Sequence, residues 1–147
     1  MASKRSKLSV EESRDWLRSA GLRCTSCRLA VLQHVATAST PLSHADVAEA
    51  LVPDGFDKST IYRCLVELAD CGFFTRLDLG DHAFRYEMRE RADRNGAEHP
   101  HFMCLDCGKV SCLPDVKVRI ASRKGRRAVA PGSVTEILLK GHCAECQ

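Results

Sequence analysis

Apolar residues recur at helical spacing through the first half of the chain. Ser9 and Glu12 have the spacing of an N-terminal capping box. Trp16 and Leu17 follow, and Gly21 is typical of a helix end, so the pattern predicts a short first helix. Three more helices are expected on the same grounds: one from Ser26 with Leu29, Leu32 and Val35 on one face, one capped by Ser43, and one capped by Asp57 that ends at Gly72.

The pattern then changes to an alternation of apolar and polar residues. Residues 73–79 (FFTRLDL) and 83–88 (AFRYEM) alternate on either side of a Gly-containing turn, which predicts a β-hairpin. Helices followed by a hairpin are the element order of a winged helix-turn-helix. Beyond the polar segment 89–98, short strands are expected in FMCLDC, GKVSCL, VKVRI and EILLKG.

The expected fold class is therefore α+β. Residues 1–88 are predicted to form an N-terminal winged helix-turn-helix domain, residues 89–98 a hinge, and residues 99–147 a small, mostly β C-terminal α/β domain. A length of 147 residues suits one domain or two very small ones. The content of 44% hydrophobic and 28% charged residues is typical of a globular protein.

The composition also argues against a membrane protein and against a secreted protein. No stretch approaches the roughly 18 apolar residues of a membrane helix. The start, MASKRSKLSVEES, lacks the apolar core of a secretory signal, so we expect a cytoplasmic protein with reduced thiols and no membrane partner. The net charge of +3 is a weak argument for nucleic acid, although residues 117–127 hold six Lys and Arg and no acidic residue.

Cysteine is the most informative residue type, with nine in the chain. Two C-x-x-C turns, Cys104–Cys107 and Cys143–Cys146, are separated by 35 residues. Each such turn lets two thiolates reach one tetrahedral ion at about 2.3 Å, so two turns complete a shell of four. The spacing therefore predicts a structural zinc site.

A third C-x-x-C, formed by Cys24 and Cys27, lies at the predicted start of the second helix. Three interpretations stay open: two small residues at a helix start, a thiol switch, or a site that uses ligands from elsewhere in the chain. Cys64 and Cys71 on the fourth helix are expected to be ordinary packing residues.

A second metal site is expected near His99-Pro-His101. Residues i and i+2 of a strand point the same way, so both imidazoles can reach one ion. Glu87 at the end of the hairpin and Cys112 on the next strand are further ligands in this hypothesis. His82, with Asp78 and Asp81, is another candidate near the hairpin turn. The alternative is a solvent-facing histidine pair. Single histidines on helices, His34 and His44, are typical of packing residues.

Five segments resemble the ferric uptake regulator (Fur) family: GLRCTSCRLAVL, PLSHADVAEAL, DKSTIYRCLVELADCGFFTRLDLGD, HPHFMCLDCGKV and GHCAEC. The resemblance runs from about Leu17 to Cys146, nearly the whole chain. It implies a homodimeric bacterial repressor whose winged helix binds double-stranded operator DNA. It also implies a C-terminal dimerisation domain and a regulatory divalent metal at the hinge.

The resemblance assigns roles to individual residues. It implies Cys104, Cys107, Cys143 and Cys146 as structural zinc ligands, Glu87, His99 and His101 as regulatory ligands, Thr60, Tyr62 and Arg63 as the DNA-reading face, and Arg23 as a minor-groove residue. The chemistry agrees, because Arg pairs with guanine, Tyr packs on thymine methyls and Thr holds a phosphate.

Departures from the family pattern refine this expectation. Pro41 stands where many members have a histidine ligand, which leaves His44 or His82 as its replacement. Cys112 stands where the family commonly has a glutamate, and a thiolate shifts preference from iron or manganese towards zinc. Residues 116–127, the expected place of the dimerisation helix, begin as the strand-like VKVRI.

The predicted function is a metal-dependent transcriptional repressor, not an enzyme, with no small-molecule substrate. Its cofactors are a structural Zn²⁺ and a second regulatory ion, Zn²⁺ favoured over Fe²⁺. One alternative is a peroxide- or redox-sensing regulator of the same family. A small zinc hydrolase, with two histidines and Glu87 around an open metal position, is disfavoured because the chain has no HExxH motif.

Overall fold

The structure, a computed structural model, describes residues 8–89, 99–119, 132 and 134–147. It divides into two compact units, Met1–Glu90 and Arg91–Gln147. No helix among the described residues is long and apolar enough to cross a bilayer.

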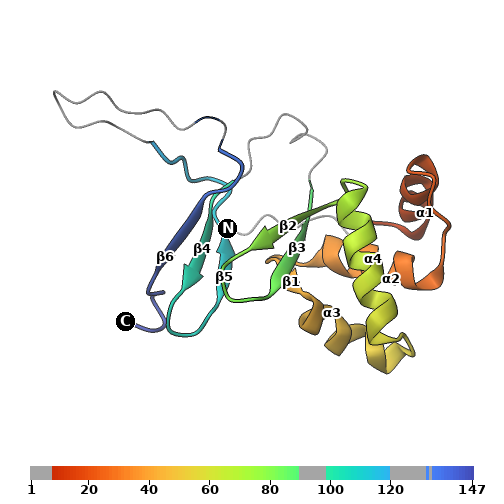
Figure 1. Cartoon of the computed structure of the whole chain (residues 1–147), viewed down its shortest axis with the longest axis horizontal. Coiled ribbons are helices and arrows are strands. Elements are labelled where there is room, and N and C mark those ends of the chain that lie inside the picture. Colours follow the sequence, from red (N-terminus) through yellow and green to blue (C-terminus); the bar gives the residue numbers. More distant parts are fainter. Residues whose placement is uncertain (1–7, 90–98, 120–131, 133) are drawn as a thin grey trace. The chain divides into compact units, whose positions relative to one another are not determined.

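The first unit begins with the four predicted α-helices (Figure 1). They are α1 (Val10–Ser19), α2 (Ser26–Thr37), α3 (His44–Leu51) and α4 (Lys58–Asp70), with a 3-10 turn, η1 (Val52–Asp54), after α3. The predicted caps are confirmed, since Ser9 forms a capping box with Glu12 and Ser43 forms one with Asp46. Asp57 caps α4. These local hydrogen bonds satisfy the first backbone N–H groups of each helix.

A three-stranded antiparallel sheet completes this unit, in the order β1-β3-β2. The predicted hairpin is confirmed as β2 (Phe74–Asp78) and β3 (Phe84–Met88), with Phe74 opposite Met88 and Asp78 opposite Phe84. The third strand, β1 (Leu42–Ser43), pairs with β3 and was not predicted, because two residues show no periodicity. Helices followed by this hairpin form a winged helix-turn-helix.

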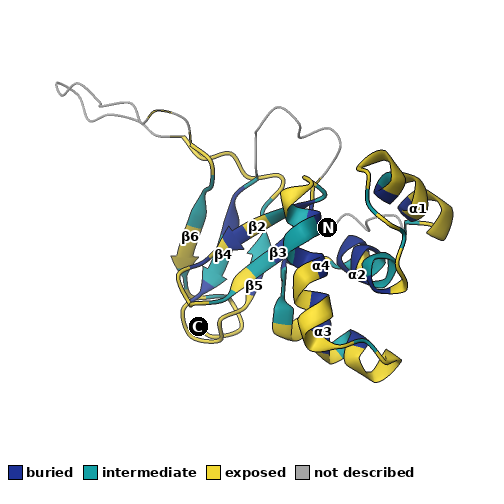
Figure 2. Cartoon of the chain, turned by 45° about the vertical axis from the view of Figure 1, so that its right-hand side comes forward, coloured by how far each residue is buried: buried dark blue, intermediate teal, exposed yellow. Residues whose placement is uncertain are grey.

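All four α-helices and the sheet share one apolar core (Figure 2). Leu17, Val31, Ile61, Leu65 and Leu68 are among its fully buried members, each 0% exposed. Burying such a side chain contributes roughly 1.5–3 kcal/mol to stability. The buried stripe of α4 leaves the opposite face of that helix to solvent.

The second unit contains a small sheet in the order β5-β4-β6. Its strands are β4 (His101–Cys104), β5 (Val110–Cys112) and β6 (Leu138–Gly141). β5 runs antiparallel to β4, and β6 runs parallel to it. The chain therefore has the predicted α+β fold class.

The strand predicted in VKVRI is wrong over its described part. Residues 116–119 are neither helix nor strand, and Val116 and Val118 are 42% and 41% exposed. Alternation alone does not make a strand, because a strand also needs a partner for its backbone N–H and C=O groups. Ile120, most of the basic segment up to residue 127, and most of the predicted hinge, residues 90–98, lie outside the described residues.

Candidate metal centres and nucleic-acid interface

The two distant C-x-x-C turns meet at one end of the small sheet. β4 ends at Cys104 and β6 ends at Gly141, and these two residues are register partners. The strand pairing thus brings together turns that are far apart in sequence. The Sγ atoms of the four cysteines all lie within 4.8 Å of one another, a set made up of Cys104, Cys107, Cys143 and Cys146.

The electrostatics of this cluster fit a divalent cation. Hydrogen bonds from the backbone at Cys107 and Cys143 lower the pKa of Cys104 to about 6, which favours its thiolate. Hydrogen bonding with Cys143 and Cys107 raises the pKa of Cys146 to about 12. Four thiolates this close repel one another, and a bound cation removes that conflict. The donor set suits zinc.

Two pairs of polar side chains also connect these turns, away from the sulfur atoms. His142 Nδ1 lies 2.6 Å from Asp106 Oδ2, and Lys109 Nζ lies 3.0 Å from Glu145 Oε1. Hydrogen bonding to Glu145 raises the pKa of Lys109. Each pair joins one C-x-x-C turn to the other. No local pattern in the sequence indicates either pair, because the partners are 36 residues apart.

A second group of ligand atoms lies on β4, on β5 and on the residues just before β4. His101 is the register partner of Cys112, and it is only 1% exposed. The rings of His99 and His101 have centroids 4.8 Å apart. Ligand atoms of His99, His101 and Cys112 lie within 4.8 Å of one another. Two imidazoles and one thiol at this spacing are able to hold a metal ion.

The other predicted ligands lie in the first unit. Glu87 is on β3, opposite Thr75, and is 6% exposed, which is unusual for a carboxylate. His82 lies in the turn between β2 and β3 with a φ of 64°, and it is exposed. Among the described residues, His82 belongs to no group of three or more metal-ligating side chains.

The predicted DNA-reading residues lie on the solvent face of α4. Thr60, Tyr62 and Arg63 are exposed, and Tyr62 is 47% exposed. Asp57 accepts hydrogen bonds from the backbone of Ser59 and Thr60, at 2.9 and 3.1 Å, and from the Ser59 hydroxyl. Hydrogen bonding to Ser59 and Thr60 holds the pKa of Asp57 below its usual range.

Sequence reasoning missed an arginine that joins α2 to this helix. Arg28 Nε and Nη2 donate to Glu67 on α4 at 2.8 and 2.7 Å. Arg28 Nη1 also donates to the carbonyl oxygen of Arg23, the exposed residue expected to enter the minor groove, at 2.9 Å. The hydrogen bond to Glu67 raises the pKa of Arg28. Arg28 and Glu67 are 39 residues apart, too far for any local pattern to indicate the pair.

The third C-x-x-C does not bring its two thiols to a common partner. Cys24 Sγ donates to the carbonyl oxygen of Arg14 at 3.6 Å. Cys27 is buried in the core, where it interacts with Cys64 on α4. Burial raises the pKa of Cys64 to about 12, and hydrogen bonding with Cys27 adds to the shift. A buried thiol of this kind is unreactive.

Comparison with known proteins identifies the family. The sequence profile of the ferric uptake regulator family matches residues 19–129. The chain belongs to the ferric uptake regulator family. The peroxide-responsive repressor PerR of Staphylococcus aureus strain Mu50 is 34% identical over 142 residues, covering 94% of this chain and 91% of PerR.

Solved structures agree on the fold. The Vibrio cholerae ferric uptake regulator superposes with a TM-score of 0.66 at 22% identity, covering 88% of this chain and 98% of that one. A zinc uptake regulator complexed with zinc and DNA gives 0.57 at 20% identity, covering 93% and 91%. The chain is thus a metal-responsive transcription regulator of the ferric uptake regulator family.

Proposed function

We propose that this family member is a zinc-responsive repressor that binds operator DNA as a homodimer. The observation that supports zinc over iron is the position of Cys112. It is the register partner of His101, and its Sγ lies within 4.8 Å of a ring nitrogen of His99. Iron(II) and manganese(II) prefer oxygen-rich sites, whereas a thiolate beside imidazoles suits zinc.

The proposed ligands divide into two sets. Cys104, Cys107, Cys143 and Cys146 hold a structural zinc ion that stabilises the C-terminal domain, residues 99–147. His99, His101 and Cys112 hold the regulatory ion, and Glu87 joins them from the winged-helix domain, residues 1–88, across the hinge at 89–98. His82 is a less favoured fifth ligand, because it is exposed in the turn of the hairpin.

Linkage explains how such a site regulates DNA binding. A ligand shifts a conformational equilibrium only when it binds one state more tightly than the other. With Glu87 in one domain and the other ligands in the next, the complete shell forms only in the arrangement that brings them together. Zinc therefore favours that arrangement, and by reciprocity operator DNA raises zinc affinity.

The proposed DNA interface uses the exposed face of α4. Arg63 pairs with guanine, Tyr62 packs on thymine methyls, and Thr60 holds a phosphate. Arg23 enters the adjacent minor groove. The bidentate ion pair of Arg28 with Glu67 supports this assignment, because it ties the backbone of Arg23 to the recognition helix.

Two further features support the proposal for the whole protein. Exposed apolar side chains in the second unit, which a homodimer would cover, are Leu105, Val116, Val118, Val134 and Leu139. Thiolate ligands need a reducing compartment, which favours the cytoplasm. A second copy of the chain and operator DNA are then its partners, with no membrane, substrate or catalytic role.

The test measures DNA binding in zinc, iron(II) and manganese(II), using duplexes selected from a randomised pool in each metal. Zinc is expected to strengthen wild-type binding roughly 5- to 150-fold. Replacing both histidines, His99→Ala with His101→Ala, abolishes this response and leaves one tightly held zinc per chain. Cys112→Asp shifts the preference towards iron or manganese.

Cys71→Ser is the matched control, because Cys71 is an exposed cysteine outside both clusters. It is expected to leave the zinc response unchanged. A wild-type protein that responds to iron or manganese more strongly than to zinc disproves the zinc assignment. A full zinc response in the double histidine variant disproves the regulatory site.

Peroxide sensing is the second candidate, favoured by the 34% identity to the peroxide-responsive repressor of S. aureus. In this candidate, His99 and His101 would hold iron(II), which would supply the redox chemistry that activates peroxide. One oxygen atom would enter the imidazole of either histidine, which would lose two electrons, and the peroxide would be reduced to water. Mass spectrometry of the iron-loaded protein after peroxide treatment separates this candidate from zinc sensing, because only peroxide sensing adds an oxygen atom to either histidine as DNA binding falls. A Cys24→Ser, Cys27→Ser variant tests the thiol-switch version.

A further inference from the structure

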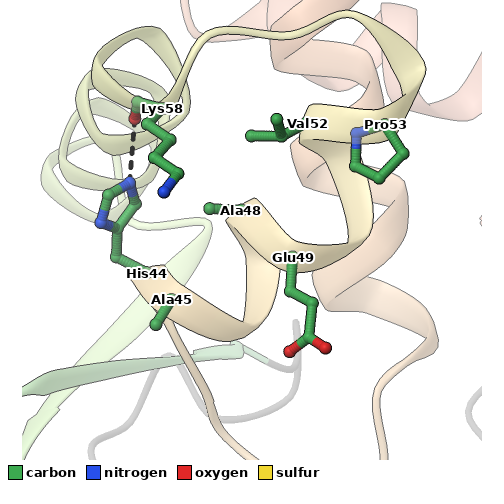
Figure 3. A pocket seen from close by; sticks show the side chains of 7 residues that line it. All are labelled: His44, Ala45, Ala48, Glu49, Val52, Pro53 and Lys58. Carbon is green, nitrogen blue, oxygen red and sulfur yellow. Dashed lines mark hydrogen bonds between the residues drawn. The ribbon is translucent and has the colours of Figure 1, made fainter.

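His44 connects the start of α3 to the recognition helix through two contacts. Its Nε2 lies 2.9 Å from the carbonyl oxygen of Lys58, the first residue of α4 (Figure 3). Its ring meets the ring of Tyr62 edge to face, with centroids 5.4 Å apart and an interplanar angle of 74°. The same imidazole thus contacts the backbone at the beginning of α4 and the side chain of Tyr62.

The hydrogen bond defines how the imidazole is held. A carbonyl oxygen only accepts, so His44 Nε2 carries the hydrogen and donates it. This bond fixes the plane of the ring against α4. The ring edge then limits the positions that the Tyr62 ring can take.

Tyr62 depends on such a neighbour because it is 47% exposed. An exposed tyrosine samples several rotamers, and ordering it opposes binding. Edge-to-face ring pairs are a favoured arrangement of aromatic side chains. We propose that His44 is a positioning residue that pre-orders Tyr62 for contact with operator bases. The inference rests on the DNA-reading role of Tyr62 proposed above.

The fold itself has other supports at this point. The start of α3 is held by the capping box of Ser43 and Asp46, and Val47 and Ala48 are buried in the core. The start of α4 is held by Asp57. Removing the imidazole therefore leaves both helices capped and packed, so its loss acts on recognition more than on stability.

Direct binding of a DNA phosphate by His44 is a weaker explanation. The hollow beside His44 has a volume of about 470 Å³ and is lined mainly by apolar side chains, with Lys58 and Glu49 as its charged members (Figure 3). A carboxylate in the lining disfavours an anion. Pre-ordering of Tyr62 requires no ligand in this hollow.

The first test needs no DNA. The chain has two tyrosines, Tyr62 and Tyr86, of which Tyr86 is 1% exposed. Fluorine NMR of protein labelled with 3-fluorotyrosine therefore shows two resonances, assigned with Tyr62→Phe. His44→Ala is expected to move the Tyr62 resonance towards that of free fluorotyrosine and to leave the Tyr86 resonance in place. A Tyr62 resonance that does not move overturns the inference.

The second test uses the selected duplex and a copy with uracil in place of thymine, which removes only the methyl groups. His44→Ala is expected to weaken binding to the thymine duplex roughly three- to ten-fold. It should weaken binding to the uracil duplex less, and it should have no further effect in a Tyr62→Ala background. His44→Gln retains a donor for Lys58 and is expected to recover part of the loss. The urea midpoint stays within error of wild type.

The outcomes separate this inference from the proposed function. Equal weakening on both duplexes by His44→Ala, while Tyr62→Ala still reduces the discrimination between them, overturns the positioning role alone. A reduced salt dependence of binding in His44→Ala indicates a direct phosphate contact and also overturns it. A wild-type protein that binds no selected duplex overturns the proposed function and this inference together.

Discussion

The two units of the chain are stabilised in different ways. In the first unit, all four α-helices and the sheet contribute to one cluster of buried apolar side chains. In the second unit, the buried residues in the part of the chain that the structure describes are Pro100, His101, Cys104 and Val110. The first unit has a core of its own, whereas the second is built around ligand atoms.

Because of this difference, we expect different changes to unfold the two units. A domain with a core depends on the packing of its side chains, so truncations inside that core destabilise it. A small domain with little buried apolar surface depends on a metal ion or a partner copy. Metal removal is therefore expected to unfold the second unit and leave the first folded.

Removal of a zinc ligand is expected to have the largest effect. Cys107→Ser takes one thiolate from the cluster of four, and ligation of a structural zinc contributes on the order of 10 kcal/mol. We expect residues 99–119 and 134–147 to lose protection in amide hydrogen exchange, while residues 10–70 keep theirs. Cys71→Ser, at an exposed cysteine of the first unit, should change neither. Simultaneous loss of protection in both units would refute the comparison.

Sequence predicted the local parts of this comparison well. The helix starts at Ser9, Ser43 and Asp57 follow from capping spacings of two or three residues. The four-cysteine cluster follows from C-x-x-C turns, because each turn is itself local. The metal that each cluster binds and the DNA-reading roles of Tyr62 and Arg63 stay predictions.

Long-range contacts could not be predicted from the sequence. Arg28 binds Glu67, which is 39 residues away in the sequence, and His44 on α3 contacts Tyr62 on α4. The segment VKVRI shows the converse error, since its alternation is local but the partner strand that it needs is not. Tertiary structure determines which residues meet, so single-sequence patterns identify elements better than their contacts.

Truncation inside the core is expected to have the next largest effect. Leu65 on α4 is 0% exposed, and Leu65→Ala should lower the free energy of unfolding of the first unit by about 3 kcal/mol, because it leaves a cavity. Urea denaturation measures this loss, and mass spectrometry should find the zinc content unchanged. Val10→Ala, at a position that is 41% exposed, should change stability by less than about 0.5 kcal/mol. Equal effects of the two substitutions would show that the core is not what holds this unit.

The ion pair between Arg28 and Glu67 is expected to have an intermediate effect. The two side chains are 19% and 36% exposed, so solvent screens part of their interaction. Arg28→Ala should lower the free energy of unfolding by about 1–2 kcal/mol, since the bidentate contact and the bond to the Arg23 carbonyl are both lost. A double-mutant cycle with Glu67→Ala measures the coupling.

Arg18 and Asp15 provide the matched pair for this cycle. They lie 3.5 Å apart on α1 with side chains 68% and 74% exposed, and their coupling should stay below about 0.5 kcal/mol. If the coupling between Arg28 and Glu67 is as small as that between Arg18 and Asp15, the pair does not fix α2 against the recognition helix.

The smallest effect is expected at the N-terminal cap of α4. Lowering the pH tests whether the charge of Asp57 stabilises the start of this helix. Hydrogen bonding to Ser59 and Thr60 lowers the pKa of Asp57, so the folded state favours its carboxylate. Its contribution to stability is complete above the unfolded-state pKa of about 4, and it is lost as the pH falls through the lower folded-state pKa.

Asp57→Asn tests this contribution, because asparagine caps the helix but does not titrate. In this variant, the hydrogen exchange of residues 58–70 should depend less on acid than it does in wild type. Asp81→Asn is the control, since the Asp81 carboxylate lies in the hairpin turn and pairs with Arg85. It should leave the acid sensitivity of α4 as in wild type. If Asp57→Asn and wild type respond alike to acid, the cap does not depend on the charge of Asp57, and the helix start is held by the core beneath it.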